Sequence, residues 1–384
     1  MWYGFCVTND PREHGAIKLA ENIFQLLDRG GFVATYKYAV LLGLIDLCLE
    51  GTTRIGEAPD MVTTRQLAEK VLELYWPQTR PFEAEGMTGA ILRQNTGTQA
   101  KIVSDILRFK EGLGIPEAGI HGARMECPEG FASLLDSIEW TLILMPLPRL
   151  QNLGGRSVPV LYFIDWDATI EKRKRMVTDY QRGRPSDFDN RISFLPGVGT
   201  YLVQLNGLLR PLIHREWMRM VAKINKLEVS RLEMFLFGPS RASTGRLRAG
   251  MVELQENRCF FCEGRMGGRV EIDHFIPWAR YPDNGIDNLV VAHRGCNHEK
   301  RDFLAAAGHV GKWVARMAPG SASESFLGGL AMDQRWEHHT DQTLGVARGI
   351  YLRLPGGTML WAGGRDFEAS QPHELTALFG SVRV

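Results

Sequence analysis

The sequence predicts an α+β protein of several domains, in which a mainly helical N-terminal region with a β-hairpin precedes a small module rich in cysteine and histidine and a C-terminal helix and hairpin region. Three observations support this fold class. The chain has 384 residues, of which 44% are hydrophobic, so it can bury a sizeable core. Apolar residues recur at helical spacing in its first third. Runs of β-forming residues and a Cys-x2-Cys pair follow.

Three helices are predicted between residues 15 and 125. Ala34 to Glu50 is a mostly apolar stretch, and Thr64 to Trp76 has apolar residues at helical spacing, with a cap at Thr63 or Thr64 and Pro77 at its end. The stretch from Ile91 to Lys110 supplies the third helix, which is expected to start after Gly97. Three helices in this order could form a DNA-binding helix-turn-helix unit, but a helical core without any nucleic-acid role is the more frequent use of such an arrangement.

Two strands are predicted after this helical part. Glu139 to Leu150 and Ser157 to Trp166 are rich in β-forming residues, and a Gly-Gly pair lies between them. This pattern is typical of a hairpin, which would form a wing or a small sheet beside the helices.

The stretch from 201 to 250 is locally basic, although the whole chain has a formal net charge of only +1. It contains nine Lys or Arg residues and three Glu residues. A helix is predicted here, with an apolar seam formed by Leu209, Ile213, Trp217, Met220, Ile224 and Leu227. Another face carries a basic stripe, which consists of Arg215, Arg219, Lys223 and Lys226. This stripe is either a solvated face or a surface that contacts phosphate groups.

The composition excludes several classes of protein. The six cysteines are too few and too scattered for a disulfide scaffold, and Cys6, Cys48 and Cys127 have no metal-pattern neighbours. No segment approaches the roughly 18 uninterrupted apolar residues of a membrane span, and the N-terminal residues lack a basic region followed by an apolar stretch. We therefore expect no membrane association and a cytoplasmic location.

Four residues between 259 and 296 have the spacing of a metal site. Cys259 and Cys262 form a Cys-x2-Cys pair, and His293 and Cys296 form a His-x2-Cys pair. Four soft or borderline ligands suit tetrahedral zinc, and the zinc would be structural because the protein fills all four positions. The alternative, buried free thiols with a surface histidine, does not explain the paired spacing.

The residues between and after these two pairs carry a second pattern. It consists of Asp273-His274 with Pro277, then Asn288-Leu289, and then Asn297 and Lys300. From Arg258 to Asp302 the sequence therefore resembles the HNH nucleases, also called ββα-metal nucleases. Two positions depart from the family pattern, because His293 stands where many zinc-bearing members have cysteine and Asn297 replaces the last histidine of the eponymous trio. Both replacements keep the ligand chemistry available.

The resemblance implies the chemistry of the site. Val270 to His274 would form a strand that ends in the reactive pair. Asp273 and Asn297 would hold a catalytic Mg²⁺ or Mn²⁺ ion through their oxygen atoms. His274 would act as the general base that takes a proton from the attacking water.

The resemblance also implies supporting residues. Asn288 would hold the histidine ring in one orientation, and Lys300, with Arg301 as a weaker candidate, would contact a phosphate beside the cut. The segment from 250 to 305 has seven Lys or Arg residues against nine Asp or Glu residues. Flanking regions must therefore supply much of the grip on nucleic acid.

Five segments are expected along the chain: a helical domain that could recognise a target (1–130), a β-hairpin-containing region (131–200), a basic helical connector (201–250), the nuclease module (251–308) and a C-terminal helix and hairpin region (309–384). Phe303 to Met317 is predicted as a helix, and Gly349 to Trp361 as a hairpin that turns at Gly356-Gly357. His338 and His339 are adjacent but receive no role.

The sequence thus predicts a metal-dependent HNH endonuclease that hydrolyses phosphodiester bonds, with DNA favoured over RNA as the substrate. By analogy it would be a bacterial restriction or antiphage defence nuclease, acting alone, as a homo-oligomer or with a defence-system partner protein. Two alternatives stay open. One is a zinc-knuckle protein that binds nucleic acid without cutting it, and the other is an effector nuclease that a ligand activates.

Overall fold

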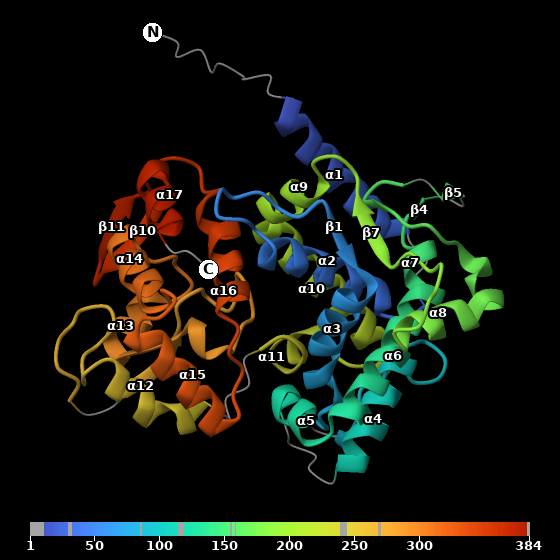
Figure 1. Ribbon diagram of the computed structural model, residues 1–384, viewed down its shortest axis with the longest axis horizontal. Coiled ribbons are helices and arrows are strands. Elements are labelled where there is room, and N and C mark those ends of the chain that lie inside the picture. Colours follow the sequence, from blue (N-terminus) through green and yellow to red (C-terminus); the bar gives the residue numbers. More distant parts are fainter. Residues whose placement is uncertain are drawn as a thin grey trace. The chain divides into compact units, whose positions relative to one another are not determined.

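The computed structural model divides the chain into two compact units (Figure 1). The first unit comprises Met1–Leu47, Pro59–Gly112 and Glu129–Leu236, and the second comprises Cys48–Ala58, Leu113–Pro128 and Phe237–Val384. The structure describes residues 11–29, 33–84, 87–113, 119–153, 156–157, 159–238, 244–267 and 270–381. Cys6, Arg241 and the Gly154-Gly155 pair of the predicted hairpin lie outside these described residues.

The first unit is built mainly of helices. They are α1 (Pro11–Arg29), α2 (Tyr36–Glu50, whose last turn belongs to the second unit), α3 (Thr64–Tyr75), α4 (Lys101–Leu113), α6 (Pro128–Leu144), α7 (Pro146–Arg149), α8 (Lys174–Gln181), α9 (Val198–Gln204), α10 (Asn206–Asn225) and α11 (Glu233–Leu236). Short 3-10 helices cover Trp76–Thr79, Ala168–Arg173 and Val229–Arg231.

Short strands complete the first unit. The antiparallel sheet β1-β7-β6 consists of β1 (Met61–Thr63), β7 (Arg191–Phe194) and β6 (Tyr162–Phe163). Two further antiparallel pairs are β2 (Phe82–Ala84) with β3 (Met87–Ala90), and β4 (Asn152–Leu153) with β5 (Arg156–Ser157).

The helices predicted in the N-terminal region are confirmed. α2 is buried along almost its whole length. α3 begins at a capping box, in which the Thr63 hydroxyl accepts from the Gln66 N–H and the Gln66 side chain accepts from the Thr63 N–H. The third predicted helix corresponds to α4, which begins at Lys101.

The helix-turn-helix interpretation is not supported. That motif joins its helices by a turn of about three or four residues. In this chain β1 lies between α2 and α3, and a 3-10 helix and the β2–β3 pair lie between α3 and α4. These helices form part of a packed core instead.

The strand predicted over Glu139–Leu150 is wrong, because α6 and α7 cover this stretch. Most of its aliphatic side chains are buried, and Leu142, Ile143 and Leu150 are fully buried. A helix that is buried on most sides gives the same apolar run as a buried strand, so periodicity cannot separate the two. Of the second predicted strand, Ser157–Trp166, only β6 and the last residue of β5 form.

The same helical stretch bears on the membrane prediction. Among the described residues, Pro128–Arg149 is long and apolar enough to cross a membrane by length and composition alone. However, 56% of its most apolar window is buried inside the structure, and the core helix of a soluble protein meets the same criterion.

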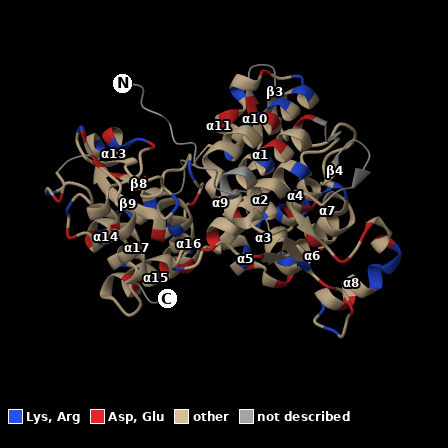
Figure 2. Ribbon diagram, turned by 90° about the horizontal axis from the view of Figure 1, so that it is seen from above, with Lys and Arg blue, Asp and Glu red and all other residues tan. Residues whose placement is uncertain are grey.

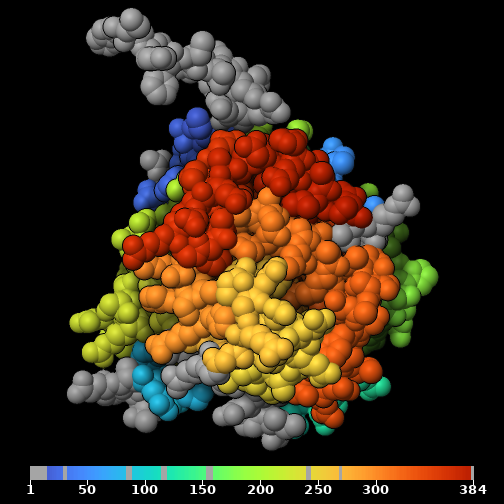
Figure 3. Space-filling view, turned by 90° about the vertical axis from the view of Figure 1, so that its left-hand side faces the viewer, coloured from blue at the N-terminus to red at the C-terminus, as the bar shows by residue number. Residues whose placement is uncertain are grey.

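The second unit contains the cysteine and histidine module (Figure 3). Its elements are α5 (Ile120–Glu126), the 3-10 helix Thr244–Leu247, α12 (Arg248–Leu254), β8 (Val270–His274), the 3-10 helix Ile286–Asn288, β9 (Leu289–His293), α13 (Arg294–Lys300), α14 (Ala307–Arg316), α15 (Ala322–Gln334), α16 (Thr340–Tyr351), β10 (Met359–Gly363), β11 (Asp366–Ala369) and α17 (Pro372–Gly380). β8 pairs with β9 and β10 with β11, both antiparallel.

Two predictions for the C-terminal region need correction. The helix expected over Phe303–Met317 begins later, at Ala307. The hairpin expected over Gly349–Trp361 is wrong, because α16 continues to Tyr351 and β10 pairs with β11 through a turn that follows Gly363. Gly357 has a φ of 79°, so the Gly-Gly signal marks a turn that leads into β10 rather than the tip of the hairpin.

Candidate active site and metal centre

The four predicted zinc ligands come together in the second unit. The ligand atoms of Cys259, Cys262, His293 and Cys296 all lie within 4.8 Å of one another. Cys259 is buried and Cys262 is exposed. Three sulfur atoms and one imidazole nitrogen are a set that zinc binds in tetrahedral geometry. The residues present therefore fit a structural metal ion.

The ring of His293 is oriented as a metal ligand. Its Nδ1 lies 3.2 Å from Cys262 Sγ, and its Nε2 lies 3.1 Å from the carbonyl oxygen of Arg265. Donation from Nε2 to that carbonyl leaves Nδ1 unprotonated and directed at the sulfur cluster. Ligating histidines in proteins are commonly fixed in this way by a hydrogen bond from the second ring nitrogen.

The thiols of the cluster have shifted pKa values. Burial opposes the thiolate of Cys259, but the backbone N–H groups of Cys262, His293 and Phe261 outweigh it and lower the pKa of Cys259. Burial, together with the negative charge of Cys259 and Cys262, raises the pKa of Cys296 to about 12. The raised pKa of Cys296 reflects the cost of a further thiolate in this site, and a bound cation would remove that cost.

The strand pair β8–β9 separates the metal cluster from the reactive pair. Val270 lies opposite His293 at one end of the ladder, and His274 lies opposite Leu289 at the other. α13 begins directly after His293 and packs against both strands. This strand–strand–helix arrangement agrees with the predicted ββα module.

Side-chain alternation on β8 places Glu271 and Asp273 on one face, next to α13. Asp273 Oδ2 lies 2.9 Å from Lys300 Nζ, and Asn297 donates to Glu271 Oε2 at 2.9 Å. The structure therefore brings Lys300 to Asp273, and Asn297 to the neighbouring Glu271. Sequence reasoning missed Glu271, although its position two residues before Asp273 on a strand was a usable signal.

The Asp273 side chain is 12% exposed, and the Lys300 ammonium is its ionic partner. Burial raises its pKa, and the Lys300 ammonium opposes that shift only in part. No donor among the described residues makes a directed hydrogen bond to Oδ2. A buried oxygen of this kind fits a cation ligand.

Lys300 does not occupy the position expected of a phosphate contact. Its side chain is 1% exposed, and Nζ donates to the carbonyl oxygen of His274 at 2.8 Å while it also pairs with Asp273. A buried ammonium requires such partners. Arg301 is exposed at the end of α13 and keeps the position expected of a surface cation.

His274 is held by two neighbours. Its Nε2 lies 3.0 Å from Asn284 Oδ1, and its ring packs edge-on against Trp278 with centroids 5.2 Å apart. Donation from Nε2 to the amide oxygen leaves Nδ1 as the basic nitrogen. Nothing in the sequence pattern had marked Asn284.

Asn288 has a different role from the one expected. It is fully buried, and its side chain accepts from the Ile276 N–H at 2.7 Å and donates to the carbonyl oxygens of Ile276 and Asp283 at 3.2 and 3.1 Å. Asn288 therefore pins the backbone that follows His274, whereas Asn284 contacts the ring itself.

The predicted basic stripe lies on α10, in the first unit. Arg215, Arg219, Lys223 and Lys226 are all exposed, but Glu216 lies 3.2 Å from Arg215 and 2.9 Å from Arg219. Arg210, which contributed to the local positive count, is 1% exposed and pairs with Asp46. The stripe is therefore less basic than the sequence count suggests.

A second basic surface of the first unit escaped sequence reasoning. It surrounds α8 and consists of the exposed residues Lys172, Arg173, Lys174, Arg175, Arg182 and Arg184 (Figure 2). Asp179 lies within 4 Å of only two of them, at 3.7 Å from Arg175 and 3.6 Å from Arg184. This α8 surface is the denser cluster of exposed positive charge of the two.

The comparisons with known proteins agree with this geometry. Residues 265–306 match the family model described as HNH endonuclease. This range contains the whole of β8, β9 and α13. No curated protein and no solved structure matches the chain.

Proposed function

We propose that the chain is a metal-dependent HNH endonuclease that hydrolyses phosphodiester bonds in nucleic acid, with DNA as the favoured substrate. One observation carries this proposal. At the end of β8, Asp273 pairs with Lys300 of α13, the same ammonium binds the main-chain carbonyl oxygen of His274, and the His274 ring contacts Asn284, all within the matched range. Hydrolysis of a phosphodiester requires a base and a hard-cation site, and the consecutive residues His274 and Asp273 offer these two kinds of group.

His274 is the general base. With its Nε2 proton committed to Asn284, its Nδ1 takes a proton from water while the water oxygen forms a bond to phosphorus and the bond to the departing 3′ oxygen breaks. The leaving oxygen takes up a proton from solvent. Trp278 limits the tilt of the ring, so the basic nitrogen keeps one direction.

Asp273 and Asn297 are the residues that would hold a Mg²⁺ or Mn²⁺ ion, and Glu271 supports Asn297 from the same strand face. When bound, such an ion neutralises the charge that builds on the phosphate oxygens in the transition state. Lys300 acts as a positioning residue, because its single ammonium holds the Asp273 carboxylate and the His274 carbonyl at once.

The zinc cluster has a structural role in this proposal. It ties the segment that carries Cys259 to the junction between β9 and α13, where His293 and Cys296 lie. Asn297 follows Cys296 directly, so a fixed cluster also fixes the start of the helix that carries the cation ligand and Lys300.

A bacterial restriction or antiphage role, alone or with a partner, is the biological setting that we favour. A ligand-activated effector is the second candidate, and one feature favours it. The first unit has an open hollow of about 520 Å³, whose lining includes apolar residues and the charged residues Asp28, Glu216, Arg219 and Lys223. Its volume falls in the range of small-molecule sites. Cleavage that appears only after addition of a small molecule would support that candidate.

Cleavage of supercoiled plasmid DNA tests the proposal. Wild type should cut only with added Mg²⁺ or Mn²⁺, and His274→Ala should cut roughly 10²- to 10⁴-fold more slowly while keeping its zinc. His373→Ala, an exposed histidine of α17, is the matched control and should behave as wild type. Equal cleavage by wild type and His274→Ala would remove His274 from the mechanism. Tight binding without any cleavage would favour a zinc-knuckle binding protein instead.

A further inference from the structure

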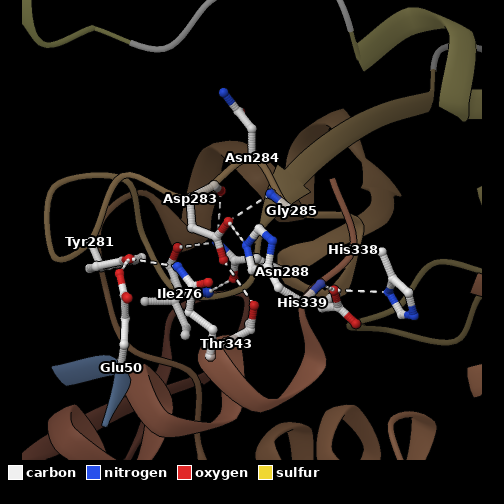
Figure 4. A network of polar contacts seen from close by, with 12 residues as sticks. Glu50, Ile276, Tyr281, Asp283, Asn284, Gly285, Asn288, His338, His339 and Thr343 are labelled. Atoms are coloured by element: carbon white, nitrogen blue, oxygen red, sulfur yellow. Dashed lines mark hydrogen bonds and ion pairs between the residues drawn. The ribbon is translucent and has the colours of Figure 1, made fainter. Parts of the chain in front are cut away.

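The adjacent histidines His338 and His339 bind two buried aspartates in the second unit (Figure 4). His339 Nε2 lies 3.1 Å from Asp283 Oδ1, and His338 Nδ1 lies 3.2 Å from Asp287 Oδ2. Asp283 is 5% exposed and Asp287 is fully buried. Carboxylates buried this deeply persist only when they are paired and hydrogen-bonded, so the loop that carries them depends on the histidines.

Further side-chain contacts join the same two segments. Thr340 donates to Asp287 Oδ1 at 2.8 Å, and Thr343 donates to Asp283 Oδ2 at 3.1 Å. The backbone N–H of His339 donates to Asp287 Oδ2 at 2.9 Å. We call the segment 336–343 the C-terminal clamp, and it lies outside the range that matches the HNH family.

The clamp also fixes the backbone of the loop. Trp336 Nε1 donates to the carbonyl oxygen of Asn284 at 2.6 Å, and the N–H of Ile286 donates to the carbonyl oxygen of Glu337 at 2.9 Å. These bonds lie on either side of Gly285. A Cβ atom there would come within 2.6 Å of His339 Nε2, so only glycine lets the histidine approach this closely.

Asn284 is the one residue of this loop that reaches the reactive histidine. Its side chain points away from the carboxylates (Figure 4), and its Oδ1 lies 3.0 Å from His274 Nε2. Its neighbour Asp283 is turned toward the clamp, where its Oδ1 contacts His339 Nε2 and also accepts from the Gly285 N–H. Any movement of the loop therefore moves the group that sets the orientation and tautomer of His274.

We propose that the C-terminal clamp is a positioning element of the catalytic site, in which His339 holds Asp283 so that Asn284 fixes the His274 ring for proton transfer. This inference rests on the function proposed above for His274. It assigns His339, Asp283 and Asn284 to the site, although His339 lies more than sixty residues beyond His274 in the sequence.

The charges around His339 support a permanently closed clamp near neutral pH. Burial disfavours its charged form, but Asp283, Glu337 and Asp287 outweigh burial and raise the pKa of His339 to about 9. His338 and His121 are the other titratable groups that interact with it. His338 lowers the pKa of Asp287 to about 2, against the effect of burial.

His339→Ala tests the proposal in the full chain. We expect kcat for plasmid cleavage to fall about 10- to 100-fold with KM little changed and zinc retained, because only the orientation of the base is lost. His339→Gln can still donate to Asp283 and should recover most of that loss. His373→Ala is again the control. An unchanged kcat in His339→Ala would overturn the proposal.

A double-mutant cycle separates positioning from a general loss of stability. If the effect of His339 passes through Asn284, His339→Ala should lower kcat far less in the Asn284→Ala background than in wild type. Fully additive effects would overturn the proposal.

NMR of ¹⁵N-labelled histidine tests the effect of the clamp on His274 even if the protein does not cut. In wild type the proton of His274 should sit on Nε2, and His339→Ala should give a mixture of tautomers. An unchanged His274 spectrum would contradict the clamp.

Discussion

The two ends of the β8–β9 hairpin are held by different kinds of interaction. At the end where Val270 faces His293, a cluster of three thiols and one imidazole gathers within 4.8 Å. At the other end, where His274 faces Leu289, neutral hydrogen bonds and buried ion pairs hold the loop from 283 to 288. One end carries residues that fit a metal ion, and the other is held by a segment more than fifty residues away.

Because of this difference, mutations at the two ends should have different effects on folding and on the rate of cleavage. A structural zinc site is nearly all-or-none, because the ligands are unpaired without the ion. The clamp is a sum of separate contacts, and each can be weakened while the others persist. Loss of the metal end should therefore abolish the module, whereas damage at the clamp end should reduce the rate of a folded enzyme.

The largest expected effect is that of Cys259→Ser. A structural zinc contributes on the order of 10 kcal/mol or more, which is comparable to the whole stability of a domain. The variant should lose its zinc, and the module should unfold with loss of all cleavage. Elemental analysis and thermal melting would check both effects. Cys127→Ser, at a partly exposed cysteine outside the metal cluster, is the control. One zinc per chain retained in Cys259→Ser would contradict the ligand set.

The sequence predicted the metal end because its signals are local. Each ligand pair is separated by two residues, and the resemblance supplied Asp273, His274 and Asn297 on elements that the structure confirms as strand and helix. Such spacing can be recognised in the sequence without knowledge of the tertiary fold. The capping box of α3 was visible for the same reason.

The clamp end was invisible because its contacts carry no periodic or spaced signal. Asp283 and His339 meet only through tertiary packing. Asp283 lies within the range that matches the family model, and His339 lies outside it. Burial also reversed the expected role of Lys300, because helical spacing predicts which face a side chain shares but not whether that face is covered. Asn288 was expected to contact the His274 ring, but Asn284 makes that contact and Asn288 binds the backbone of Ile276 instead.

A smaller effect is expected from Gly285→Ala. The added Cβ would lie 2.6 Å from His339 Nε2 and 2.9 Å from Asp283 Oδ1, so the ion pair must shift. Overpacking of this kind costs about 1–3 kcal/mol. We expect a lower melting temperature, a kcat reduced about 10-fold and full zinc content. Gly308→Ala in α14, where a Cβ meets nothing within 4 Å, should leave all three unchanged. Loss of zinc from Gly285→Ala would mean that the two ends are not independent.

The smallest effect is a dependence of stability on pH. Because the pKa of His339 rises from its ordinary value of 6.5 to about 9 on folding, its pairing contributes fully below pH 6.5 and is lost as the pH rises through about 9. Removal of protons does not weaken a zinc–thiolate cluster. Between pH 7 and 10, amide hydrogen exchange corrected for its intrinsic rate should therefore accelerate at Gly285 and Ile286 but not at Val291 and His293.

The variant His339→Gln shows whether that titration belongs to His339. Glutamine keeps a donor for Asp283 but has no proton to lose, so exchange at Gly285 and Ile286 should no longer change between pH 7 and 10 in this variant. Asp283 and Asp287, whose pKa values are lowered, stay ionised throughout that range, so the imidazoles that pair with them are the groups that respond. If wild type and His339→Gln loosen equally, His338 or a group elsewhere titrates instead, and the charge on His339 is not what closes the clamp.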